Sequence, residues 1–432
     1  MTIFRIRFAL IATLLFCSFA LQVSAQTTAD TTAAPSSILS LSDAIKATLA
    51  KNPQLSSFQF RKQALEGELQ TAALRPAFQI GATVENAAGT GEYSGSKSAE
   101  VTLTLSSIIE FGDKQEARMG VVNERQQGLD LQQRIIELDL LSEVARRFID
   151  VATAQKMLGL RQSTHSLATE TTASIKQRVN SGNTPDAELA RAQANQSRTA
   201  IELYQAELKF DAARIKLSGM WGSTNPTFTS VNADLFSTGD ILPLYELLAQ
   251  LSDRPDILLF ANEARMKDAE VRLALSQSKA DVEWNAGIRR LQASDDTAVV
   301  LGISVPLFAN NRAAGELTTA KANRLGVDIE REVAFRQMRT QLVILYQEHK
   351  ASLFELKSLR NDVIPQLKIA LRETKAAFDK GRYGYLELST AQRELLEAES
   401  ALIDAAANVH LLRSEIERLS GTSTAQNSEV KP

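Results

Sequence analysis

Two long stretches with helical periodicity constrain this chain more than any other feature. They run from about residue 112 to 178 and from about 313 to 380, and they end at glycine-containing breaks, Ser181-Gly182-Asn183 and Lys380-Gly381-Arg382. A second helical stretch follows each break. At ~1.5 Å per residue each outward stretch can span ~100 Å, several times the ~30 Å of a membrane core. The sequence therefore predicts two long helical hairpins that bridge a distance.

The spacing of apolar side chains within these stretches is that of packed helices. In the first, apolar residues recur at steps of three and four with charged residues between them, as in Leu131, Ile135, Leu138, Leu141, Val144 and Phe148. This spacing predicts coiled-coil-like packing. In the second, Pro365 predicts a break or kink, because proline has no N–H to donate within a helix.

In two shorter regions the apolar residues recur at every second position instead of every third or fourth. Apolar residues alternate with small or polar ones in four segments: Phe78 to Val84, Val101 to Leu105, Val282 to Ile288 and Val299 to Val305. Each pair of segments predicts a β-hairpin with one apolar face and one small, polar face. Such a hairpin fits a membrane strand with lipid on one side and water on the other, and it fits equally a soluble hairpin packed on a core.

The two halves of the chain repeat each other. Asn52-Pro53 recurs as Arg254-Pro255, 202 positions later, and Gly182 recurs as Gly381, 199 positions later. A shared order of elements at a near-constant offset indicates a duplication. We therefore expect a mainly α fold with a small β part, built from two helix–hairpin–long-helix repeats. The expected boundaries are 41–221 for the first repeat, 222–241 for a linker and 242–421 for the second repeat.

The two ends of the chain differ in composition from the repeats. Residues 1–25 have the basic start, apolar middle and small-residue site of a cleaved signal peptide, with an uncleaved anchor or a lipid on Cys17 as alternatives. Residues 26–40 are expected to be a flexible leader, and 422–432 a polar tail. Since Cys17 is the one cysteine, the mature chain can form neither disulfides nor thiolate metal sites.

Composition argues against several function classes. A net charge of −3, with 44% apolar and 23% charged residues, excludes a disordered chain and predicts no nucleic-acid partner. Nucleophile–base sets and phosphate-binding glycine loops are missing from the sequence, and its three histidines lie far apart, so we expect no enzyme, no cofactor and no bound metal.

Strand number determines the expected assembly. A transmembrane barrel needs at least about eight strands, and an open sheet edge cannot face lipid, whereas each copy offers four strands. Three copies of four strands give twelve, and three copies of four long helices also give twelve. The hypothesis is thus a homotrimer that forms a 12-stranded outer-membrane β-barrel continuous with a 12-helix periplasmic α-barrel.

Two motifs give the sequence a family resemblance. Leu39 to Leu55 (LSLSDAIKATLAKNPQL) is similar to the opening motif of the TolC-type outer-membrane efflux proteins, and Ala377 to Arg393 (AFDKGRYGYLELSTAQR) to their second hairpin tip. The resemblance covers residues 39–421. Within the family, Ile109 to Lys114 and Pro306 to Arg312 look like the CzcC-like heavy-metal branch rather than the multidrug branch.

The resemblance implies a function and partners. It implies a passive exit duct in the cell outer membrane that extends into the periplasm. A periplasmic adaptor protein and an inner-membrane proton-driven pump would complete the system. Heavy-metal cations are the expected cargo, with drugs or secreted proteins as the alternative. Two other classes compete with a channel. A periplasmic adaptor would carry one helical hairpin and several β-domains. A structural coiled-coil protein would show unbroken heptads.

Six residues are candidate functional positions. Gly182 and Gly381 permit the helix reversals and, by the resemblance, mark the periplasmic tips where an adaptor docks. Asp186 and Glu387 are candidate gate acids, or else a helix-start acid and a solvated surface residue. Phe78 and Trp284 are candidate aromatics of the membrane strands.

Overall fold

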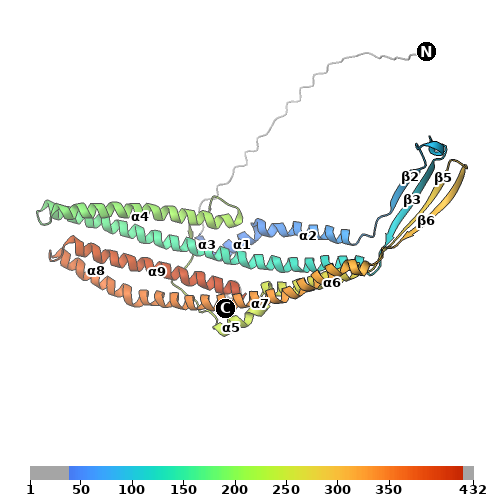
Figure 1. Ribbon diagram of the computed structural model, residues 1–432. Helices are drawn as coiled ribbons and strands as arrows, with labels where there is room; N and C mark the ends of the chain where they lie inside the picture. The colour runs from blue at the N-terminus through green and yellow to red at the C-terminus, as the bar shows by residue number, and fades with distance from the viewer. Residues whose placement is uncertain (1–37, 422–432) are drawn as a thin grey trace, which may run out of the picture.

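The computed structural model describes residues 38–421 as a long, bent rod with a sheet at one end and two helical tips at the other (Figure 1). The expected signal peptide, residues 26–37 of the expected leader and the tail at 422–432 lie outside the described residues. Among the described residues, no helix is at once long enough and apolar enough to cross a membrane.

The first repeat begins with two short helices separated at Asn52. Ser40 caps the first helix, because its Oγ accepts the N–H of Asp43 at 3.2 Å. The Asn52 side chain caps the second helix and Pro53 occupies its first turn. The elements are α1 (Leu41–Lys51), α2 (Pro53–Ala72), β2 (Gln79–Glu85), β3 (Glu100–Ile109), α3 (Lys114–Asn180) and α4 (Asp186–Ser218).

The second repeat follows the same order. Its elements are α5 (Leu244–Gln250), α6 (Pro255–Gln277), β5 (Val282–Leu291), β6 (Asp296–Ser304), α7 (Ala309–Ser358), α8 (Ile364–Asp379) and α9 (Tyr385–Ser420). The expected break at Pro365 is present: a π-helical segment, Leu359–Val363, separates α7 from α8 directly before it. The wider turn accommodates the proline ring, which would otherwise clash with the carbonyl one turn earlier.

The four long strands form one antiparallel sheet in the order β2-β3-β5-β6. Its register places Ile80 opposite Leu105, and Ala286 opposite Leu301, so the apolar side chains of all four strands share one face. In the single chain this face is bare: Ile80 is 85% exposed and Leu301 77%. The opposite face carries mainly small and polar side chains, and β2 and β6 are the edge strands of the sheet.

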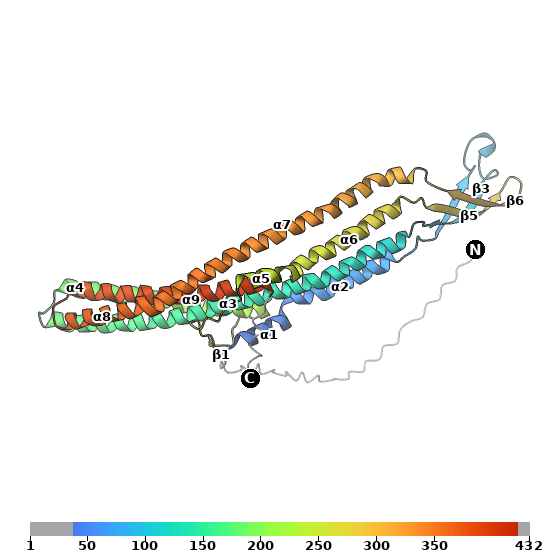
Figure 2. The same ribbon diagram turned by 90° about the horizontal axis from the view of Figure 1, so that it is seen from below.

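The helices continue the order of the strands. Next to the sheet, α2 packs on α3, α3 on α6 and α6 on α7, so these four helices form a row parallel to the strand order (Figure 2). Farther from the sheet, α4 packs on α3, α3 on α9 and α9 on α8. The molecule is therefore a curved layer one helix thick, with two free lateral edges.

The largest core lies midway along the rod, where the linker between the repeats wraps the helices. Linker residues Phe228, Val231 and Leu235 are buried with side chains of α3 and α9. Two-residue strands β1 (Ile38–Leu39) and β4 (Ser230–Val231) pair in parallel beside them. The end of the expected flexible leader is thus ordered, because Leu39 packs against this core.

One glycine of the sheet permits a close contact on the polar face. A Cβ at Gly287 would lie 2.5 Å from the Leu103 carbonyl oxygen and 2.8 Å from Thr104 Cγ2. Because that oxygen belongs to the strand ladder, we expect Gly287→Ala to destabilise the folded protein by about 1–3 kcal/mol. The matched control is Gly159→Ala on α3, where a Cβ meets no heavy atom within 4 Å and alanine should stabilise the helix by about 0.5–1 kcal/mol. Thermal unfolding of the two variants measures both; equal melting temperatures would contradict the expectation.

Two histidines near the linker, the buried His349 and the half-buried His410, make stability sensitive to acid. Burial lowers the pKa of His349, and the positive charge of Arg413 lowers it further. Burial also lowers the pKa of His410, although the hydrogen bond to the Leu235 carbonyl opposes that shift. The His349 side chain is 2% exposed and its Nε2 has no hydrogen-bond partner. Both rings are therefore held neutral in the folded chain.

We expect the free energy of unfolding to fall as the pH drops below about 6.5, the pKa of a histidine in an unfolded chain. Below that pH the unfolded chain binds protons on these histidines while the folded chain does not. The free energy of unfolding is therefore greatest above about pH 6.5, and it decreases as the pH falls toward the lower pKa of the histidines in the folded chain. Replacing His349 with methionine should remove part of this acid sensitivity, since the variant has one buried ring fewer to protonate. Melting temperatures at pH 7.5 and 5.5 test this, and an undiminished difference in His349→Met would refute it.

Candidate docking site at the helical tips

The two helix reversals at the far end from the sheet have the same hydrogen-bonded turn. Gly182 and Gly381 each have φ of +70°. At the first tip the N–H of Asn183 donates to the Arg178 carbonyl at 2.9 Å; at the second the N–H of Arg382 donates to Ala377 at 2.9 Å. This is the Schellman pattern, in which a left-handed residue ends a helix and glycine is favoured. Both glycines therefore close the reversals, and their role in docking remains a prediction.

Arg178 joins the two tips. Its Nη1 donates to the Phe378 carbonyl oxygen at 2.9 Å, and its guanidinium lies 4.4 Å from the centre of the Phe378 ring. Behind this contact the two hairpins share a small apolar core of Ile175, Ala192, Phe378, Tyr385 and Leu388. The tips of both repeats thus form one end surface rather than two independent loops.

The two candidate gate acids lie at the starts of the return helices. Asp186 is the first residue of α4, and Glu387 lies in the first turn of α9; both are exposed. Glu387 accepts the N–H of Gly384 at 3.0 Å, and carboxylates at this end of a helix are favoured by its dipole. Each acid therefore lies in the first turn of a helix, which accounts for it locally, and Glu387 also makes a capping hydrogen bond. A further role in narrowing a pore stays a prediction.

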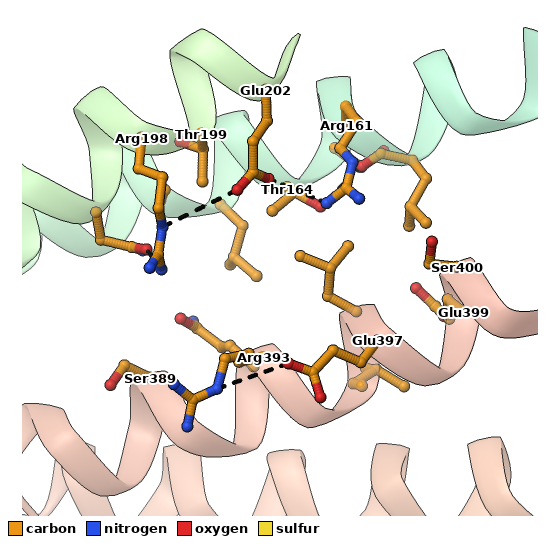
Figure 3. Close-up of a pocket in the computed structure, with 18 of the residues that line it drawn as sticks. Arg161, Thr164, Arg198, Thr199, Glu202, Ser389, Arg393, Glu397, Glu399 and Ser400 are labelled. Carbon is orange, nitrogen blue, oxygen red and sulfur yellow. Dashed lines mark hydrogen bonds and ion pairs between the residues drawn. The ribbon is translucent and has the colours of Figure 1, made fainter. Parts of the chain in front are cut away.

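An open groove of about 950 Å³ lies between the hairpins, just behind the tips (Figure 3). Residues of α3, α4 and α9 line it, with Leu371 from α8. Its polar side chains form short ion-pair ladders: Arg161 and Arg198 lie 3.0 and 4.0 Å from Glu202 on one side, and Arg393 lies 3.9 Å from Glu397 on the other. Two of these ion pairs run along one helix each and the third joins α3 to α4, so paired charges of both signs line the open groove.

The candidate membrane aromatics meet at the other end of the rod. The rings of Phe78 and Trp284 pack edge to face, with centroids 6.3 Å apart and planes at 73°. They lie at the end of the sheet nearest the helices, where β2 and β5 begin. This position between sheet and helices is where an interfacial aromatic would sit, but a membrane role for the pair is still a prediction.

The described residues offer no group of three or more histidine, cysteine, aspartate or glutamate side chains that could hold a metal ion. His165 Nδ1 lies 3.0 Å from Thr199 Oγ1, and His410 Nε2 lies 3.0 Å from the Leu235 carbonyl oxygen. The site at the tips is thus a surface of turns, paired charges and open volume.

Reasoning from the sequence missed Arg178 and the groove. Arg178 and Phe378 are 200 positions apart, and no local pattern links them. The groove did leave a signal: an arginine followed four positions later by a glutamate occurs on both return helices, at 198–202 and 393–397. Comparing the two repeats for shared charge spacing would have found these rims.

Both the first repeat and the overall fold match known outer-membrane efflux proteins. The model of the family "Outer membrane efflux protein" matches residues 44–223, nearly the whole first repeat. The solved structure of CusC superimposes with a TM-score of 0.74 at 17% identity, over 89% of this chain and 92% of that one. The family match to the first repeat and the shared fold confirm the resemblance to outer-membrane efflux proteins.

Several curated proteins are similar in sequence over most of the chain. The cobalt-zinc-cadmium resistance protein CzcC of Cupriavidus metallidurans is 22% identical over 89% of this chain and 90% of that protein. The nickel and cobalt resistance protein CnrC of the same organism is 28% identical over 61% of this chain and 64% of that protein. The solvent efflux pump outer membrane protein SrpC of Pseudomonas putida is 23% identical over 63% of this chain and 60% of that protein.

Proposed function

We propose that three copies of this chain form the outer-membrane channel of a tripartite efflux system, and that the channel is a passive exit duct for heavy-metal cations. The observation that carries the proposal is the sheet. It has one bare apolar face, one small polar face and an edge strand on each side, so a single copy leaves both its apolar face and its sheet edges unsatisfied.

Closure with further copies removes both problems. If β6 of one copy pairs with β2 of the next, three copies of the four-stranded sheet close into a barrel of twelve strands. The apolar face then meets lipid and the polar face encloses water. The helix row follows the same order, so it closes into a tube beneath the barrel.

The lateral helices carry apolar side chains that such a tube would cover. On α7, Leu325, Ile329 and Val333 recur every four residues and all are exposed. On the opposite edge of the layer, Phe60 of α2 and Leu74, just after that helix, are exposed. Exposed apolar stripes at both edges favour a heterologous contact between copies, the type that closes rings.

The rest of the system follows from the tips and the groove. We place the adaptor protein at Gly182, Gly381 and the groove behind them, and an inner-membrane proton-driven pump beyond the adaptor. Asp186 and Glu387 would stand at the mouth, where three copies of each attract cations. The chain itself acts as a duct and not as an enzyme.

The cargo is proposed from the relatives. CzcC and CnrC are named for resistance to cobalt, zinc, cadmium and nickel, and CzcC matches nearly the full length of both chains. SrpC is named for solvent efflux and matches a smaller share, so organic solvents or drugs are the second candidate.

A deletion strain tests the function. The strain and its complemented control are challenged with cobalt, zinc, cadmium, nickel, copper and silver salts, and with toluene and a drug panel. The proposal expects sensitivity to one or more metals that the wild-type gene restores. Sensitivity to solvents or drugs alone would establish the second candidate, and a purified protein that stays monomeric and makes no pores in a lipid film would refute the channel.

A further inference from the structure

The polar face of the sheet carries a charged cluster at its far end, away from the helices. Glu85 lies directly opposite Glu100 in the β2–β3 ladder, next to the loop that joins the strands. Arg289 of β5 lies between them: it is 3.0 Å from Glu100 and 3.3 Å from Glu85, and its Nε donates to Thr102 Oγ1 at 3.0 Å. Three strands from both repeats thus meet at this cluster.

The cluster contains more negative than positive charge. Two carboxylates facing each other across a ladder repel, and one guanidinium offsets only one of them. Asn86 donates a further hydrogen bond to Glu100 at 2.9 Å. Asp296, opposite Leu291 in the β5–β6 ladder, is exposed at the same end of the same face. Arg289 is therefore the one basic side chain set among three acidic ones on this part of the face.

The charges remain in contact with water. Arg289 is 34% exposed, Glu85 49% and Glu100 21% in their side chains. Toward the helices the same face carries Gly81, Thr104, Gly287 and Gly302, so each of the four strands has a small residue there. Charges lining a narrow aqueous path act on ions far more than the same charges on an open surface.

We infer that Glu85, Glu100 and Arg289 form a charge-selective ring at the outer end of the pore, and that this ring sets the preference of the channel for cations. The inference rests on the proposed function, because the ring exists only when three copies enclose their polar faces. Three copies bring six of these glutamates and three arginines to one level. The ring favours hydrated cations and weakens the entry of anions from outside.

Single-channel recording of the purified trimer in a planar lipid film under a KCl gradient tests the inference. Arg289→Gln removes three positive charges, so the cation-to-anion permeability ratio should rise at least about two-fold, and more at low salt. Glu85→Gln and Glu100→Gln should each lower the ratio. Arg289→Lys keeps the charge and should leave the ratio near the wild-type value.

The matched control is Arg290→Gln. Arg290 follows Arg289 directly but lies on the apolar face, where it pairs with Asp295 and hydrogen-bonds Thr297. Its loss should leave the ratio unchanged. A purely structural role for the cluster predicts lower melting temperatures for the Arg289 and glutamate variants without opposite shifts in selectivity.

The outcomes separate the two proposals. An unchanged ratio in Arg289→Gln, or an equal shift in Arg290→Gln, overturns the inference while wild-type pores still support the channel. If Arg289→Gln does not insert, the two glutamate variants decide the inference by the same measurement. A wild-type protein that makes no pores overturns the proposed function and the inference with it.

Discussion

Replacing Leu301 with arginine should prevent the protein from entering the outer membrane. Leu301 lies in the interior of β6, on the apolar face, and is 77% exposed in the single chain. In a lipid-facing barrel an arginine near the bilayer midplane costs about 2–4 kcal/mol, and a trimer carries three, so the penalty is roughly 6–12 kcal/mol. We expect the variant to be lost from the outer-membrane fraction, with little heat-stable trimer, by fractionation and gel analysis.

The neighbouring residue provides the control. Val300 is opposite Gly287 on the polar face, so an arginine there would point into water inside the barrel. Val300→Arg should reach the membrane and assemble, because lumenal substitutions tune a pore without meeting lipid. If both variants insert equally, the apolar face does not face lipid; if both fail, the sheet tolerates no charge and the comparison refutes the assignment of faces.

Periodicity was enough to predict most of the fold. Alternation at Ile80 and Leu301 identified the strands and their apolar face, and the register confirms it. Pro365 identified the break, and Gly182 and Gly381 identified the reversals, because each residue type has a backbone requirement that few alternatives meet. These features are local, so a single sequence contains them.

Contacts between distant segments were beyond the reach of the sequence. The sequence predicts the bounds of the linker but not its packing: Phe228 and Leu235 insert into a core made by α3 of the first repeat and α9 of the second. The N-cap of α1 also needed the structure: Ser40 and Ser42 both stand at the start of a helical pattern, and only the hydrogen bond from Asp43 identifies Ser40.

The candidate sites show the same division. Asp186 and Glu387 were proposed from their position after the tips, and the structure adds that both lie in the first turn of a helix. The joining of the tips by Arg178, and of three strands by Arg289, depends on pairs formed between the two repeats. A duplication tells which elements correspond, but it does not tell which side chains of one repeat touch the other.

Reversing the charges on the rims of the groove should abolish export while leaving the channel intact. Arg198 and Arg393 stand on opposite rims, 63% and 58% exposed, each near a glutamate four positions later. Such surface pairs contribute only about 0–1 kcal/mol to stability, so Arg198→Glu with Arg393→Glu should fold and insert normally. Across a docked interface, however, like charges brought together cost several kcal/mol, and three grooves multiply the effect. We expect metal tolerance to fall to the level of the deletion strain.

Two further variants distinguish docking from folding. Arg336→Glu breaks an ion pair of the same spacing with Glu332 on α7, outside the groove, and should leave tolerance unchanged. The swap Arg393→Glu with Glu397→Arg preserves an ion pair along α9 but inverts its direction. If the groove serves only to stabilise the hairpin, the swap restores wild-type tolerance. If it binds the adaptor by complementary charge, the swap stays impaired, and co-purification with the adaptor is reduced in the swap as in the reversal but not in Arg336→Glu.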